Sequence, residues 1–363
     1  MTIMFAPSFS SSFFSSISRR DFIAAATLSA AGISSSTFSR GVWAKEPEKK
    51  SVTIAVGGKN LYYYLPMALA DWMGFYKEEG LDVKVVDFQG GSKSLQAVVG
   101  GSADVVSGAF EHTLMMQTKR QRMTAFVLQD RAPQCVFVMN RTTMKDEKDP
   151  AKLKGRRIGV SAPGSSTHVI ANFVMQRAGV KPNEFSVIGV GTGAGAIAAM
   201  RAGQIDALVG LDPVITQLTD EKAITIVTDT RRVDESDALY GGAMVGGCLY
   251  APEAFVKANP ETVQRLTNAV IRSLKVIEKV SPETLLKSVP RQAFMGNPDL
   301  YAHCFVNNRP SMSTNGRFPA GCVEAAAKAL SSVTPALASF KFDAASCFAN
   351  QFAEASPINA KKA

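Results

Sequence analysis

The sequence predicts an α/β protein with two similar lobes, and three observations support this prediction. From Ser51 onward, strand-like and helix-like segments alternate, a pattern typical of β-α-β units around a mostly parallel sheet. The same order of segments then occurs a second time. At a spacing of 102 residues, Gly91, Gly101 and Asp104 are matched by Gly193, Gly203 and Asp206. We therefore expect an internal duplication with one copy in each lobe.

The first copy is predicted from changes in apolar periodicity. The expected strands are Ser51–Val56, Leu81–Phe88 and Ala103–Ser107, and the expected helices are Leu65–Glu79 and Gly90–Val99. In the second copy the expected strands are Arg157–Ser161, Phe185–Val190 and Ile205–Gly210, and the expected helices are Ser165–Ala178 and Gly195–Ala202. Glycines such as Gly80 and Gly179 follow predicted helices and mark their ends.

Two further strand-like runs, Cys135–Asn140 and Ala243–Tyr250, separate the copies from the rest of the chain. We expect them to be paired strands that cross between the lobes and form a hinge. The first lobe then comprises residues 45–140 and 245–363, with helices over 251–280 and beyond Gly321. The second lobe comprises residues 141–244.

The first 44 residues have the features of an export signal. Arg19 and Arg20 precede a short run of small apolar residues, Ala24–Ile33, which is too short for a membrane span of about 20 residues. Val42-Trp43-Ala44 provides a small-residue cleavage site. We expect a twin-arginine signal peptide over 1–44 and a periplasmic mature protein. A disordered or mitochondrial-type leader shares these features and stays open.

The composition narrows the possible partners. The formal net charge is +9, but the basic residues are spread along the chain, so we expect no nucleic-acid partner and a general attraction for small anions. Five cysteines without a CxxC pattern give no reason to expect a metal site. We expect no cofactor.

The candidate site lies in the loops that lead from strands into helices, because open α/β sheets bind ligands there. These loops contain Asn60, Ser92, Ser165, Ser166, Thr167 and Thr192. Hydroxyl donors and helix N-termini together favour an oxyanion such as a sulfonate, carboxylate or nitrate. The alternative is that these hydroxyls cap the helices that follow.

Two acids and several aromatic residues complete the candidate set. Glu111 and Asp212 follow predicted strands and could bind an amine of a zwitterionic ligand, or cap the next helix instead. Tyr62 and Phe110, with Tyr63, could form apolar walls or belong to the core. The three histidines fit no hydrolase or metal pattern, and the glycine spacing after Ile188 does not fit a dinucleotide fingerprint. We therefore expect no catalytic residues.

Several motifs occur together in a characteristic order. They are Leu65–Ala70, Gly74–Val83, Gly90–Ser92, Gly101–Asp104, Leu153–Val160 and Ala202–Ala207. In this order they resemble the nitrate/sulfonate/taurine-type (NMT1/THI5-like) substrate-binding proteins of ABC transporters, over roughly residues 51–280. This family shares its fold with the yeast thiamine-pyrimidine synthase.

The resemblance implies a type II periplasmic-binding fold, in which two α/β lobes joined by a two-strand hinge enclose a ligand. It also implies a monomer that delivers its ligand to a membrane permease with an ATPase. In such relatives the loops matching Ser92 and 165–167 contact the oxyanion. Asp212 matches an acid of some relatives, although Leu211 stands where a tryptophan is often found.

Other functions on the same fold stay open. A thiamine-pyrimidine synthase-like enzyme would have a cysteine-rich motif, and a desulfinase-like enzyme would have a cysteine within residues 57–64; neither is present. Among ligands, a sulfonate or taurine fits the donors together with both acids. Nitrate leaves the acids unexplained, and a pyrimidine or an aromatic carboxylate could use the tyrosines.

Overall fold

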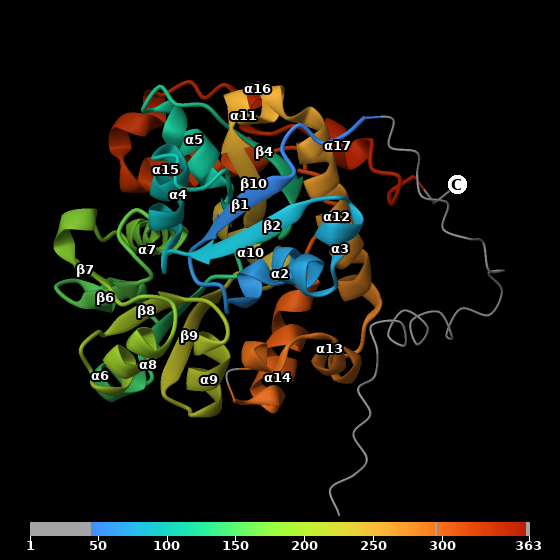
Figure 1. Ribbon diagram of the computed structural model, residues 1–363. Coiled ribbons are helices and arrows are strands. Elements are labelled where there is room, and N and C mark those ends of the chain that lie inside the picture. Colours follow the sequence, from blue (N-terminus) through green and yellow to red (C-terminus); the bar gives the residue numbers. More distant parts are fainter. Residues whose placement is uncertain (1–44, 295, 361–363) are drawn as a thin grey trace, which may run out of the picture. The chain divides into compact units, whose positions relative to one another are not determined.

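The computed structural model describes residues 45–294 and 296–360, and these form one compact unit (Figure 1). The twin-arginine signal expected over 1–44 lies outside the described residues. In the described ranges, no helix is both long and apolar enough to cross a membrane.

Two five-stranded sheets form the frame of the molecule, and they have the same topology. The first sheet has the order β2-β1-β3-β10-β4, with bounds β1 Ser51–Val56, β2 Asp82–Asp87, β3 Val105–Ala109, β4 Met123–Leu128 and β10 Gly247–Pro252. The second has the order β7-β6-β8-β5-β9, with bounds β5 Val136–Asn140, β6 Arg157–Val160, β7 Ser186–Gly189, β8 Ala207–Gly210 and β9 Ile224–Asp229. In each sheet, one antiparallel strand lies between the third and fourth strands of that copy. The two α/β lobes predicted from the repeat are confirmed.

The repeated aspartates explain part of this symmetry. The backbone N–H of Asp104 donates to the carbonyl of Thr53 at 2.9 Å, and its carboxylate accepts from the Thr53 N–H at 2.9 Å. Asp206 makes the same pair of bonds to Arg157, at 2.8 and 3.0 Å. Each aspartate therefore holds the start of the third strand against the first strand of its copy.

The expected pairing of the two crossing strands is wrong. Val136–Asn140 pairs with β8 and β9 in the second sheet, whereas Gly247–Pro252 pairs with β3 and β4 in the first. Both strands are buried along almost their whole length, which suits the interior of a sheet better than an exposed crossing. The lobes are instead joined by the chain between β4 and β5 and by the chain between β9 and β10. The second sheet therefore begins at residue 136, inside the segment 45–140 that we assigned to the first lobe.

Helices cover both sheets. Those of the first lobe are α2 Leu65–Trp72, α3 Phe75–Glu78, α4 Gly91–Val99, α5 Glu111–Gln117, α11 Glu253–Ala258 and α12 Pro260–Lys279. Those between β5 and β10 are α6 Arg141–Met144, α7 Ser166–Arg177, α8 Ala194–Arg201, α9 Val214–Asp220 and α10 Val233–Tyr240. The C-terminal helices are α13 Pro282–Ser288, α14 Pro298–Asn308, α15 Cys322–Val333, α16 Ala344–Cys347 and α17 Gln351–Glu354. Short 3-10 turns include η1 Tyr62–Tyr64.

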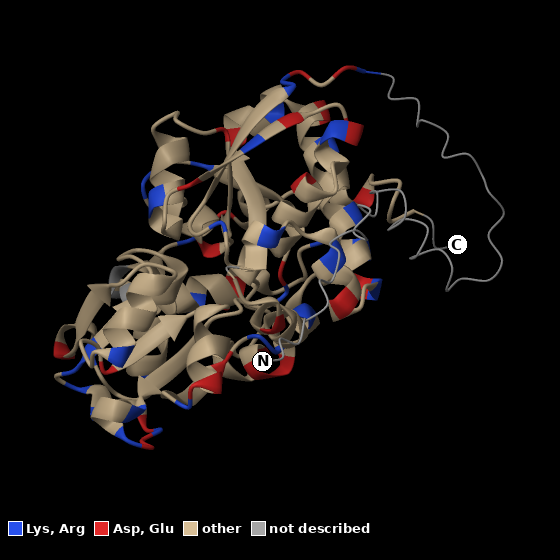
Figure 2. Cartoon of the chain, turned by 60° about the horizontal axis from the view of Figure 1, so that its bottom comes forward, with Lys and Arg blue, Asp and Glu red and all other residues tan. Residues whose placement is uncertain are grey.

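Two C-terminal helices touch the second lobe. Helix α15 packs against α7, and α14 packs against α9 (Figure 1). Buried residues of α7 and α15, such as Ile170 and Ala326, belong to one apolar cluster with the core of the first lobe. The two sheets are thus joined by helix packing as well as by the two connecting segments. Figure 2 shows Lys and Arg distributed over both lobes rather than gathered in one patch, as the sequence suggested.

Candidate functional site

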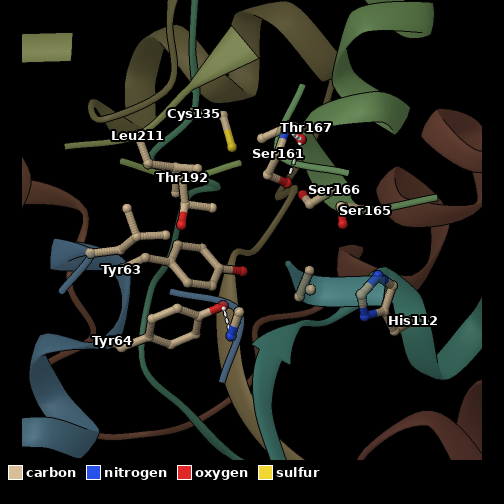
Figure 3. Close-up of a pocket in the computed structure, with 14 residues that line it drawn as sticks. Tyr63, Tyr64, His112, Cys135, Ser161, Ser165, Ser166, Thr167, Thr192 and Leu211 are labelled. Atoms are coloured by element: carbon tan, nitrogen blue, oxygen red, sulfur yellow. Dashed lines mark hydrogen bonds between the residues drawn. The ribbon is translucent and has the colours of Figure 1, made fainter. Parts of the chain in front are cut away.

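A small cavity lies where the strand-to-helix loops of the two sheets meet (Figure 3). Its volume is about 30 Å³, which is room for one or two water molecules. It is lined by Gly57, Leu61, Tyr63, Tyr64, Gly91, Ala109, His112, Cys135, Ser161, Ser165, Ser166, Thr167, Thr192 and Leu211. This lining contains hydroxyls, one thiol and one imidazole, and it contains no Lys, Arg, Asp or Glu. Four of the predicted residues, Ser165, Ser166, Thr167 and Thr192, lie here together.

Ser92 also lies at this junction, where it bonds directly to the other lobe. Its backbone N–H donates to Oγ of Ser165 at 3.1 Å, and its own Oγ donates to the carbonyl of Pro163 at 3.0 Å. Oγ of Ser165 in turn donates to Oγ of Ser92 at 3.3 Å. The two loops predicted to contact an oxyanion thus bond to each other in this closed arrangement.

A glycine permits the first two loops to lie side by side. A Cβ atom at Gly57 would lie 2.5 Å from backbone atoms of both Gly90 and Gly91, closer than real contacts allow. The N–H of Gly57 donates to the hydroxyl of Tyr64 at 3.1 Å. The end of β1 is therefore held close to the start of α4, as a glycine makes possible.

Tyr63, rather than Tyr62, lies in the cavity. The Tyr63 hydroxyl points toward the centre of the cavity and has no hydrogen-bond partner (Figure 3). Burial raises the pKa of this phenol well above its usual value, so it is a neutral donor. Tyr62 turns away: its hydroxyl donates to the carbonyl of Tyr301, and the two rings lie 4.7 Å apart. Three consecutive tyrosines in a 3-10 turn point in different directions, and the sequence alone does not show which of them faces the cavity.

His112 is a cavity residue that the sequence reasoning did not select. Its Nδ1 lies 2.9 Å from the hydroxyl of Tyr250, and its Nε2 forms no hydrogen bond of ordinary geometry. Burial lowers the pKa of His112 to about 4, and the backbone of Gly164 opposes this shift only in part. The imidazole is therefore neutral at pH 7. The sequence feature that could have identified His112 as a site residue is its position directly after Glu111, just beyond the end of a buried strand.

Glu111 lies directly behind the cavity lining and is 1% exposed. Its charge acts on the side chains of Tyr63 and Cys135, which both line the cavity. Neither carboxyl oxygen forms a hydrogen bond of ordinary geometry. Burial raises the pKa of Glu111, and the nearby Ser166 hydroxyl offsets only part of that effect.

Asp212 and Phe110 do not line the cavity. One oxygen of Asp212 accepts from Nη1 of Arg231 at 3.0 Å and from Nδ2 of Asn308 at 2.6 Å, and the other accepts from the N–H of Thr216 at 2.8 Å. An acid with these partners is satisfied by the protein itself. The Phe110 ring packs 5.3 Å from that of Phe318 in the core.

Thr167 lines the cavity and also bonds within its own lobe, whereas Asn60 lies elsewhere. Oγ1 of Thr167 accepts from the N–H of Ser161 at 3.0 Å and lies 2.9 Å from its hydroxyl. Thr167 thus joins the end of β6 to the start of α7 while lining the cavity. Asn60 lies beside Tyr62 and Tyr301, at a separate and smaller pocket.

Other lining residues become neighbours only through the arrangement of the lobes. Cys135 comes from the segment that joins them, and Ser161 and Leu211 come from the ends of β6 and β8. The sequence predicts where strands end, but it does not predict which side chains of the connecting segment point into the cavity. In the described part of the chain, no group of three or more His, Cys, Asp or Glu side chains could hold a metal ion.

Comparison with known proteins agrees with this fold. A profile described as NMT1/THI5 like matches residues 62–281. A solved structure from Bordetella bronchiseptica RB50 is 47% identical, with a TM-score of 0.82, over 85% of this chain and 98% of that one. The alkanesulfonate-binding protein SsuA from Xanthomonas axonopodis pv. citri, bound to MOPS, is 18% identical, with a TM-score of 0.63, over 84% and 100%.

An enzyme is also among the relatives. The 4-amino-5-hydroxymethyl-2-methylpyrimidine phosphate synthase of Aspergillus parasiticus is 26% identical over 65% of this chain and 69% of its own. The architecture is that of periplasmic binding proteins. With its profile match over more than half of its length, the chain belongs to the NMT1/THI5-like family.

Proposed function

We propose that this protein is the substrate-binding component of an ABC-type importer. It captures a small anionic or zwitterionic solute, most directly a sulfonate of the taurine type, in the cavity between its lobes. The observation that carries this proposal is the direct bonding of Ser92 to Ser165 and Pro163 across that cavity. When the lobes separate, the same hydroxyls and the first turn of α4 become available to an oxyanion.

Capture requires the lobes to open. A cavity of about 30 Å³ is smaller than any sulfonate-bearing solute, so the closed arrangement cannot admit one. A solute that bonds to both lobes favours closure by its difference in affinity between the two states. The connecting segments meet where Gly246 donates to the carbonyl of Asp130 at 2.9 Å, and Asp130 in turn donates to the carbonyl of Gly247 at 3.0 Å. We expect hinge motion at these residues. Asn140, which we also expected near the hinge, caps α6 inside the second lobe.

The remaining parts of the proposal concern location and partners. Arg19 and Arg20 support export by the twin-arginine route to the periplasm. There the protein would act as a monomer and deliver its solute to a permease with its ATPase.

Thermal unfolding against a panel of compounds tests this function. The panel contains taurine, alkanesulfonates, nitrate, the thiamine pyrimidine and aromatic carboxylates. A solute at about 100 times its Kd adds about 2.7 kcal/mol to the folded state, a clear rise in Tm. A rise with one chemical class supports the proposal and identifies the solute class. No rise with any class, for a folded and ligand-free protein, would contradict it.

A further inference from the structure

Glu111 is a buried acid that forms no ion pair within the described residues 45–294 and 296–360. It lies in the first turn of α5 and is 1% exposed, and neither of its oxygens forms a hydrogen bond of ordinary geometry, although the Ser166 hydroxyl lies close enough to lower its pKa in part. Buried carboxyl groups normally pair with a cation or accept several hydrogen bonds, because leaving one unpaired opposes folding. Asp212, the other acid of the candidate site, has three partners of its own. Glu111 therefore has carboxyl oxygens available to a ligand, whereas the carboxylate of Asp212 is already bound by the protein.

Among the described residues, the groups that interact electrostatically with Glu111 come from four elements and one connecting segment, and none carries a positive charge. They are Tyr63 of η1, Cys135 before β5, Ser166 of α7, Tyr240 of α10, and Cys248 and Tyr250 of β10. Asp130, a second buried acid, acts on the same Tyr63 and Cys248. All of the facing groups are hydroxyls or thiols, which can donate one hydrogen bond each but cannot neutralise a carboxylate.

The lobes cover this acid from opposite sides. Glu111 belongs to the first lobe, whereas Ser166 is the first residue of α7 in the second lobe. Ser166 lines the cavity beside Tyr63 (Figure 3). Separation of the lobes would therefore withdraw Ser166 from Glu111 and uncover this side of the acid.

We propose that Glu111 binds a hydrogen-bond-donating nitrogen group of the ligand, so that the cleft selects solutes carrying an ammonium or amidine-like group beside their anionic group. This inference rests on the proposed function and narrows its substrate class to zwitterions. A simple anion leaves Glu111 buried without a partner on closure, whereas an ammonium group supplies the missing cation.

The same arrangement predicts a dependence on pH. Burial raises the pKa of Glu111 in the closed protein without ligand, so this acid takes up a proton at a higher pH than an exposed glutamate does. An ammonium ligand favours the ionised form. Affinity for such a ligand therefore falls as the pH decreases and Glu111 takes up a proton. His112, with its pKa of about 4, stays neutral over most of this range.

Matched pairs of probes test the inference by calorimetry on the full chain. Taurine is compared with isethionate, in which a hydroxyl replaces the ammonium group, and β-alanine with 3-hydroxypropionate. The variants are Glu111→Gln, which keeps the shape, and Glu79→Gln as the control. Glu79 is another buried glutamate with a raised pKa, but its carboxylate accepts from Asn268 at 3.2 Å, and neither residue lines the cavity.

We expect the wild type and Glu79→Gln to bind the ammonium member of a pair at least tenfold more tightly at pH 8, with the preference shrinking toward pH 5. Glu111→Gln should lose that preference and its pH dependence while keeping its affinity for the hydroxy member. Equal binding of both members by the wild type, or an unchanged preference in Glu111→Gln, would overturn the inference and leave the proposed function intact. Failure of every probe to bind would overturn the inference, and the thermal-unfolding panel would then decide the proposed function separately.

Discussion

Two aspartates, Asp104 and Asp206, make equivalent hydrogen bonds in the two lobes. Asp206 is 1% exposed, and its carboxylate accepts from the backbone and the side chain of Arg157 at 3.0 and 3.1 Å. Burial alone would raise the pKa of Asp206, but these hydrogen bonds outweigh it and the pKa is lowered. The residues that repeat most clearly in the sequence are therefore structural.

Replacing this acid should weaken the fold in a pH-dependent way. We expect Asp206→Asn to lower the free energy of unfolding by about 2 kcal/mol at pH 7, because hydrogen bonds to a charged group are lost. A carboxylate whose pKa is lowered by folding stabilises the folded protein at pH values above its pKa in the unfolded chain, which is about 4. This stabilisation is lost as the pH falls through its pKa in the folded protein. The difference from wild type in urea unfolding should then shrink by pH 3. The exposed Asp82→Asn serves as control, and a difference independent of pH would contradict the assignment.

Gly57 offers a second test at the same scale. We expect Gly57→Ala to lower the free energy of unfolding by about 1 to 3 kcal/mol, because the new methyl group must displace the backbone of Gly90 and Gly91. A Cβ at Gly193, which repeats Gly91 in the second lobe, meets nothing within 4 Å, so Gly193→Ala should be nearly neutral. Equal effects of the two substitutions in urea unfolding would show that the close approach of the loops is not needed.

The site could be predicted from the sequence only up to side-chain direction. Strand ends, glycines and hydroxyls located Ser165, Ser166, Thr167 and Thr192, because the carboxyl ends of parallel strands share one edge. Phe110 points into the core instead of the cavity. Direction depends on which face of each turn meets the other lobe, and a single sequence does not record that.

At the scale of elements, periodicity was sufficient for the repeated β-α-β units. The strands and helices of both copies occur close to their expected positions, since each alternates between a buried sheet and a covering helix. Periodicity did not predict which strands lie beside β5 and β10, because each of these two strands pairs with segments distant in the sequence. Helices α13 and α14 were also not predicted.

Helix α14 connects the C-terminal region to the second lobe through Asn308. This side chain is 0% exposed, and its Nδ2 donates to Asp212 at 2.6 Å and to the carbonyl of Cys304 at 2.8 Å. We expect Asn308→Ala to lower the free energy of unfolding by about 1 to 3 kcal/mol, because Asp212 loses a buried donor. Asn307→Ala, which removes a half-buried bond to Thr216, should cost less. A larger effect of Asn307→Ala in urea unfolding would contradict this role.

At the scale of the whole molecule, closure must be reversible for the proposed function. The Ser92–Ser165 contacts and the small cavity describe a closed arrangement, while α7 and α15 share apolar contacts that open and closed forms must both accommodate. We expect small-angle scattering to show a smaller radius of gyration with saturating solute than without it. The same radius in both conditions would mean that the solute enters without hinge motion.

An enzyme is among the relatives, so it matters most to test whether this protein captures its solute without converting it. The direct measurement is to incubate the purified protein with one equivalent of the solute identified by thermal unfolding, then denature it and analyse the solution by mass spectrometry. We expect the solute to be recovered unchanged and in full after prolonged incubation. A new product that accumulates in proportion to the protein would contradict it and identify the chain as an enzyme.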